Sequence, residues 1–115
     1  MQNIDIQDRA KKFAVRVIRM VRALPKEGAS FVIGKQVIRS ATSIGANLVE
    51  GGGGATKKDF INFMNIARKS ALETRYWLEL IIAADLLKEG KLKELLCEIE
   101  EIIKILTRII LNSKK

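Results

Sequence analysis

Apolar residues recur at steps of three and four along four stretches of the chain, and this spacing predicts four amphipathic helices. We expect the helices to cover about residues 5–23, 31–51, 57–87 and 92–112. Pro25, the glycine run 51–54 and Gly90 mark short connections between them. Because short connections favour antiparallel neighbours, the pattern predicts an all-α protein, an up-down-up-down antiparallel four-helix bundle formed by residues 1–115 as a single domain.

The ends of the predicted helices carry residues that commonly cap helices. Ser30 is expected to cap the second helix, and Thr56, with Asp59 three residues later, is expected to cap the third. The glycine run that begins at Gly51 is expected to end the second helix, because glycine reaches positive φ angles without strain.

The predicted second helix carries a polar stripe beside its apolar stripe, and most of its side chains are small. Small hydroxyls and an amide in register with a core face predict close contact with another helix, where buried polar groups must be hydrogen bonded. We expect a structural polar cluster between the second and third helices, made of Arg39, Ser43, Asn47, Glu50, Ser70 and Glu73.

Within this cluster, Arg39 is predicted to reach Glu73. If the loop at residues 51–55 reverses the chain, residues whose numbers sum to about 110 face each other across the two helices, within about a turn. An arginine–carboxylate pair would then satisfy both charged groups in a partly buried site.

Basic residues form a stripe along the predicted first helix. No acidic residue lies between Asp8 and Glu27, so no partner one turn away neutralises the stripe. Two interpretations remain open, a solvated face and a phosphate-binding ridge. The residues of this candidate nucleic-acid-binding ridge are Arg9, Lys12, Arg16, Arg19 and Arg22.

The overall charge fits either interpretation of the stripe. A formal net charge of +8 and a pI near 9.9 suit a polyanionic partner, although charge also serves simple solubility. Cys97 is the one cysteine, which indicates a reducing compartment and an inert thiol. With no apolar run of membrane length and no signal peptide, the sequence predicts a cytoplasmic protein without membrane contact.

Most enzyme chemistries find no support in the sequence. The chain has no histidine, which removes Ser-His and Cys-His catalysis and the common zinc ligands. The glycine run is not a phosphate loop, because Thr56 stands where that motif needs its second glycine and a helix precedes the run. Thr56 with Lys57 and Lys58 could hold one phosphate of a larger polyanion, but an ordinary helix cap is the preferred interpretation. We therefore expect no enzyme, no cofactor and no metal site.

Two carboxylates, Glu50 and Glu73, raise the alternative of a small hydrolase. Paired acids usually work with a metal, a nucleophile or a deep pocket, and the sequence shows no second acid near Glu50 and no histidine. A satisfied structural network explains the same residues with fewer requirements.

The polar stripe also belongs to a set of motifs that continues into the predicted third helix. The motifs are Arg39-Ser40-Ala41 with Ser43-Ile44, Asn47-Leu48-Val49-Glu50-Gly51, Asp59-Phe60 with Phe63, and Ile66-Ala67 with Ser70 and Glu73. In these motifs the chain resembles the four-helix-bundle proteins of the 23S ribosomal RNA intervening-sequence family, to which the accessory protein of diversity-generating retroelements is similar. Lys69 stands where the family usually has glycine, and Lys58 and the glycine run replace a more common Gly-Arg, so no role of that arginine is carried over.

The resemblance implies a homopentamer in a nucleic-acid context, with a protein partner such as a reverse transcriptase. A surplus of apolar positions independently predicts self-association. The leading interpretation is a non-enzymatic oligomer that binds RNA or DNA without sequence specificity, as an accessory to a nucleic-acid enzyme or to ribosomal RNA. The alternative is a structural or protein-interaction module. The surplus comprises a second apolar seam on the third helix together with Val15, Ile18, Ile105 and Leu111.

Overall fold

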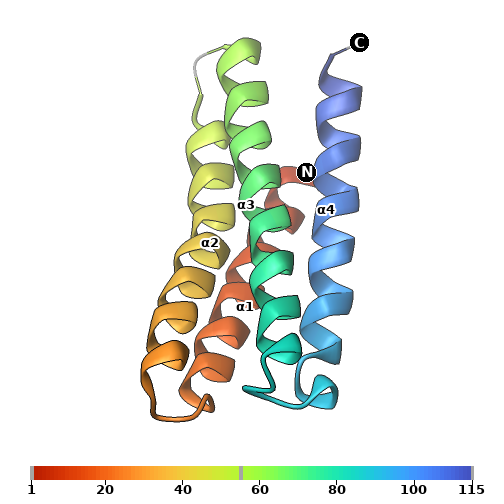
Figure 1. Ribbon diagram of the computed structural model, residues 1–115. Coiled ribbons are helices and arrows are strands. Elements are labelled where there is room, and N and C mark those ends of the chain that lie inside the picture. Colours follow the sequence, from red (N-terminus) through yellow and green to blue (C-terminus); the bar gives the residue numbers. More distant parts are fainter. Residues whose placement is uncertain (1, 55, 115) are drawn as a thin grey trace.

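The computed structural model describes residues 2–54 and 56–114. It contains four long helices and, before the last of them, one turn of 3-10 helix, η1 (Glu89–Lys91) (Figure 1). The predicted all-α four-helix bundle is confirmed. The long helices are α1 (Gln2–Arg22), α2 (Gly28–Gly52), α3 (Lys57–Ala83) and α4 (Lys93–Ser113).

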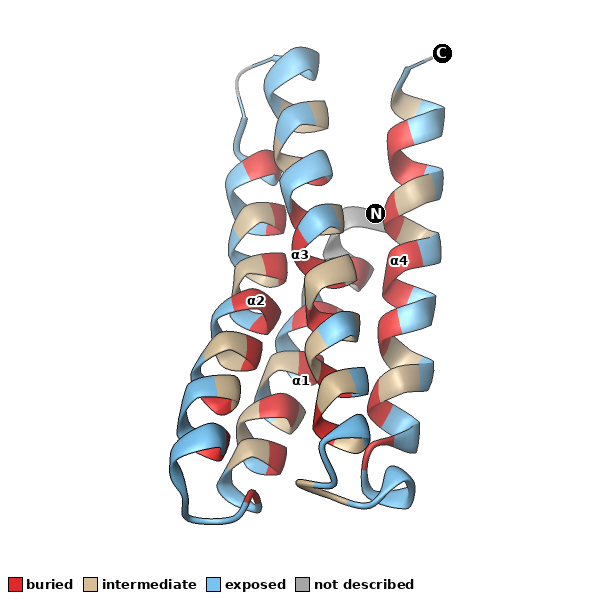
Figure 2. Ribbon diagram, viewed as in Figure 1, coloured by how far each residue is buried: buried red, intermediate tan, exposed pale blue. Residues whose placement is uncertain are grey.

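Consecutive helices run antiparallel and are neighbours around the bundle. Helix α1 packs against α2 and α4, and α3 packs against the same two helices, so the four helices occupy the corners of a square in chain order (Figure 1). Each helix turns one buried stripe toward the bundle axis and leaves its outer face to solvent (Figure 2). The core is mostly aliphatic; its largest buried side chains include Phe13, Ile44, Leu78 and Leu106.

Helix α2 begins earlier than predicted and has a different cap. The carboxylate of Glu27 accepts hydrogen bonds from the backbone N–H groups of Ala29 and Ser30, at 3.0 and 3.2 Å. The Ser30 hydroxyl donates to the same carboxylate at 3.0 Å. The backbone bond from Ala29 and then the Ser30 hydroxyl lower the pKa of Glu27, because they favour its charged form. The expectation that Ser30 caps the helix is therefore wrong: Ser30 lies inside α2, where it is buried.

The glycine run serves close packing rather than a left-handed turn. Helix α2 continues through Gly51 and Gly52, and among the described glycines none has a positive φ angle. A Cβ atom at Gly51 would lie 2.7 Å from Met64 Cε and 2.9 Å from Phe63 Cβ, so a larger residue there would push α3 away. The predicted cap of α3 is confirmed, since Thr56 Oγ1 accepts the Asp59 N–H at 3.0 Å.

Helix α3 ends at Ala83, four residues before the predicted end. Asp85 follows in the left-handed region, with φ of 58°, and the Leu86 N–H donates to the Ile81 carbonyl at 3.0 Å. Leu86 and Leu87 still pack on the core as half-buried side chains. The apolar pattern therefore continues past the point where the backbone leaves the helix, which explains the overextended prediction.

Candidate nucleic-acid interface

The polar cluster lies between α2 and α3, close to where it was predicted. Ser43 and Ser70 are hydrogen bonded through their hydroxyls at 3.0 Å, and Asn47 Nδ2 donates to Ser43 Oγ at 3.0 Å and to the Ser43 carbonyl at 2.8 Å. A second contact joins Thr74 Oγ1 to Ser40 Oγ at 2.8 Å. No buried side-chain nitrogen or oxygen of the described residues lacks a hydrogen-bond partner. The cluster thus costs little desolvation, because each polar group is satisfied.

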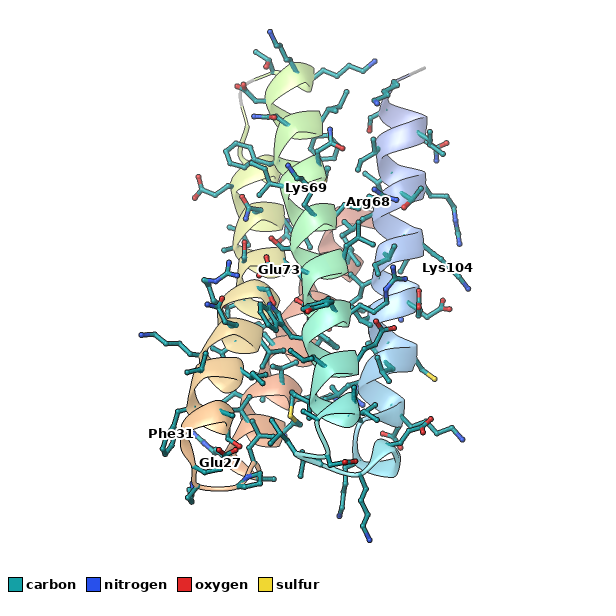
Figure 3. All side chains as sticks on the ribbon, viewed as in Figure 1. Glu27, Phe31, Arg68, Lys69, Glu73 and Lys104 are labelled. Carbon is teal, nitrogen blue, oxygen red and sulfur yellow. The ribbon has the colours of Figure 1, made fainter. Side chains whose placement is uncertain are left out.

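The Arg39–Glu73 ion pair is confirmed and has two further members. Arg39 Nε donates to Gln36 Oε1 at 3.1 Å, and Trp77 Nε1 donates to Glu73 Oε2 at 2.9 Å. Figure 3 shows Glu73 on the side of α3 that lies next to α2. The Arg39 side chain is 56% exposed and that of Glu73 37%, so the pair lies at the surface rather than in the core.

Glu50 does not join the cluster. Its side chain is exposed, and among the described residues it has no hydrogen-bond partner. At this level α2 faces Phe63 and Met64, which approach Gly51 closely and offer no polar group. Ser40, Thr74 and Trp77 take part instead. Ser40 lies three residues before Ser43 on α2, and Thr74 and Trp77 each lie four residues after Ser70 and Glu73 on α3. This spacing was the signal that would have found them.

Three cations of the α1 stripe are paired with acids. Arg9 forms a two-point contact with Glu98 of α4, at 2.7 and 3.0 Å, and Arg16 reaches Glu94 at 3.3 Å. Lys12 pairs with Asp8 at 3.0 Å along α1. The hydrogen bond to Glu98 raises the pKa of the Arg9 guanidinium. The prediction that no partner one turn away neutralises the stripe is wrong for Lys12, which pairs with Asp8, and the partners of Arg9 and Arg16 come from α4.

The five stripe residues do not share one surface. Arg16 and Arg19 line a groove of about 410 Å³ between α1 and α4, together with Gly90, Lys91 and Glu94. We call this the α1–α4 groove. Arg22 instead lines a separate hollow between α1 and α2. Among the described residues, Arg19, Arg22 and Lys91 have no ion-pair partner.

The apolar surplus is partly exposed. Val15 is 40% exposed and Leu111 58%, whereas Ile18 and Ile105 are half-buried. On the second seam of α3, Ile66 is 39% exposed, while Phe63 and Trp77 are half-buried against the core.

No group of His, Cys, Asp and Glu among the described residues could hold a metal ion, and Cys97 is exposed. No helix in this part of the chain has the length and apolar character needed to cross a bilayer.

Known proteins are similar to this chain in both sequence and fold. The sequence profile of the 23S rRNA-intervening sequence protein matches residues 2–108. The chain belongs to this family. It is also similar to a crystal structure from Bacteroides thetaiotaomicron of a protein of unknown function from the S23 ribosomal protein family, with 40% identity and a TM-score of 0.89. The similarity covers 96% of this chain and 98% of that one. No curated protein matches the chain.

Proposed function

We propose that this member of the 23S rRNA-intervening sequence protein family is a non-enzymatic, self-associating bundle that binds RNA or DNA without sequence specificity. The observation that carries the proposal is the α1–α4 groove, where Arg19 and Lys91 face solvent without an acidic partner among the described residues. The net charge of +8 is consistent with a polyanion as ligand.

Only some of the basic residues of the α1 stripe are available to bind phosphate. Arg16 contributes, because its pair with Glu94 joins a carboxylate that is 91% exposed, and such pairs are weak enough for a phosphate to displace. Lys12 is equally accessible, since its pair with Asp8 is exposed on both sides. Arg9 stays with Glu98, because a two-point contact with a carboxylate that is only 22% exposed is harder to replace.

The groove offers charge without a means to recognise bases. Its lining contains no aromatic side chain on which a base could stack, so binding should depend on phosphates alone. In an oligomer each copy repeats the groove, and weak contacts add through effective concentration. The family resemblance supplies the number five for the oligomer and the role of accessory to a nucleic-acid enzyme such as a reverse transcriptase.

A mobility shift with generic RNA and DNA at several salt concentrations tests the proposal. We expect binding that weakens steeply with salt, because each phosphate contact releases counterions. The double variant Arg19→Glu, Lys91→Glu should lose most of the affinity while keeping its helical circular dichroism.

The matched control is Lys69→Glu, Arg108→Glu, which changes the net charge equally at exposed positions of α3 and α4 that do not line the α1–α4 groove. Equal losses in both variants would mean that only overall charge matters. Absence of binding by the wild type at low salt would favour the alternative, a protein-interaction module. The exposed apolar residues Phe31, Val32 and Tyr76 are the observation that supports this second function.

A further inference from the structure

The hollow that Arg22 lines, between the end of α1 and the start of α2, has an apolar interior, and we call it the α1–α2 hollow. Its volume is about 240 Å³, and its lining includes the buried residues Leu24 and Gly34 and the half-buried Ile38. Phe31 borders the hollow from the first turn of α2, at the lower end of the bundle, and is 64% exposed (Figure 3). The hollow therefore offers apolar walls and one accessible aromatic ring.

Cations surround this apolar interior. Arg22, Lys26 and Lys35 line the hollow, each is exposed, and none has an ion-pair partner among the described residues. Glu27, the acid next to Lys26 in the sequence, does not line the hollow. Its carboxylate accepts hydrogen bonds from backbone N–H groups in the first turn of α2, so its charge is already engaged there. The border of the hollow thus keeps three positive charges for a ligand.

The size and the lining of the hollow together select the class of ligand. Pockets for drug-sized molecules measure about 300–1,000 Å³, so this smaller hollow suits a single ring system. An exposed aromatic side chain such as Phe31 stacks on the face of a nucleobase, while cations beside it bind the phosphates of the same strand. A nucleotide within a strand has this combination of one flat ring system and a phosphate on each side.

From this match we infer that the α1–α2 hollow receives one unpaired base of a nucleic-acid strand, stacked on Phe31, with the neighbouring phosphates on Arg22, Lys26 and Lys35. The inference rests on the proposed function and narrows its ligand to single-stranded segments. A base inside a duplex is paired and stacked, and it must be extruded at a cost in free energy before it can enter a pocket. Because every base has a flat face, the stack adds affinity without sequence specificity.

The hollow and the α1–α4 groove are close enough for one strand to occupy both. The α1–α2 connection, which borders the hollow, lies at the same end of the bundle as the α3–α4 connection, which supplies Gly90 and Lys91 to the groove (Figure 1). Arg19 of the groove and Arg22 of the hollow are three residues apart, or about 4.5 Å along α1. A strand that crosses the last turn of α1 therefore contacts both arginines.

Three DNA ligands of equal length, offered to the full chain, test the inference: a single strand, its duplex, and a single strand made of abasic nucleotides. The intact and abasic strands carry the same phosphates, so the difference between them measures the contribution of the bases alone. Fluorescence anisotropy at low salt should show that the intact strand binds at least about five-fold more tightly than the abasic strand, the lower end of the effect of one base–aromatic stack.

Substitutions of Phe31 assign this difference to the hollow. Phe31→Ala should remove the advantage of the intact strand, while its affinity for the duplex and the abasic strand and its circular dichroism stay unchanged, because the ring is exposed. Phe31→Trp keeps an aromatic face and should restore the advantage. The matched control is Tyr76→Ala, which removes another exposed aromatic side chain, one that does not line the hollow, and should bind all three ligands as the wild type does.

The outcomes separate this inference from the proposed function. If the wild type binds none of the three ligands, both fail. If it binds the intact and abasic strands equally, or if Phe31→Ala keeps the advantage of the intact strand, the base site fails and the phosphate contacts of the α1–α4 groove stand. An apolar tip beside cations is also suited to an anionic lipid surface. Sedimentation with phosphatidylserine vesicles that is lost in Phe31→Ala, together with equal affinity for the intact and abasic strands, would assign the hollow to lipid instead.

Discussion

The α2–α3 and α1–α4 contacts use polar residues in opposite ways. Between α2 and α3, hydroxyls lie inside the contact and are hydrogen bonded across it, as in the pairs Ser40–Thr74 and Ser43–Ser70, and the Asn47 amide donates to Ser43 from within α2. Between α1 and α4, the polar contacts are ion pairs at the rim, Arg9–Glu98 and Arg16–Glu94. In both contacts the polar stripe lies next to the apolar stripe of its helix. Small polar side chains pack inside the contact between two helices, whereas long charged side chains pair at its solvent-exposed border.

The largest test of this comparison enlarges a residue inside the α2–α3 contact. Ser40 is fully buried, and Ser40→Leu should destabilise the protein by about 1–3 kcal/mol, since the added atoms force the helices apart. Urea unfolding would measure the change. Asn62→Leu, which places the same leucine on the exposed face of α3, should change stability little. Similar losses in both variants would show that the contact is not tightly packed.

A smaller effect is expected at the edge of the same contact. Glu73→Ala removes the acceptor of Trp77 and the partner of Arg39, and because the pair is half exposed we expect a loss of about 1 kcal/mol. Glu73→Gln keeps an acceptor for the indole and should recover part of the loss in thermal unfolding. If the glutamine variant is no better than the alanine variant, the charge rather than the indole hydrogen bond matters.

The smallest effects belong to the α1–α4 rim. A double-mutant cycle with Arg9→Ala and Glu98→Ala should give a coupling of about 0.5–1 kcal/mol, because the contact is two-pointed and partly buried. The same cycle for Arg16 and Glu94 should give no measurable coupling, since Glu94 is 91% exposed. Equal couplings at the two sites would contradict the assignment of Arg16 as a displaceable partner of phosphate.

The features predicted correctly from the sequence are those that depend on the spacing of residues within one helix or on the reversal of the chain between two adjacent helices. The four helices, the Thr56 cap and the Arg39–Glu73 pair all follow from spacing within one or two adjacent helices. Glu27 as a cap was missed because serine is the more frequent cap, and a glutamate carboxylate competes only when its longer side chain folds back.

The errors at the candidate site have a different origin. The pairing of Arg9 with Glu98 depends on the rotation of α4 about its axis, which no local pattern fixes. Glu94 and Glu98 at a spacing of four residues on the fourth helix were the available signal, since they must lie on one side of it. Arg19 and Arg22 line different hollows for a similar reason. The three-residue step from Arg19 to Arg22 turns the side chain from the α4 side of α1 toward its α2 side.

The hydroxyl contacts between α2 and α3 have a consequence for the outer surface of the bundle. They are directional, so a slide of α3 by one turn, about 5.4 Å, would break them, whereas purely aliphatic ridges could slide and repack. The hydroxyls therefore fix the axial register of the two helices. Side chains on the outer faces of α2 and α3 keep a constant height relative to each other, so a surface built from both helices has one fixed shape.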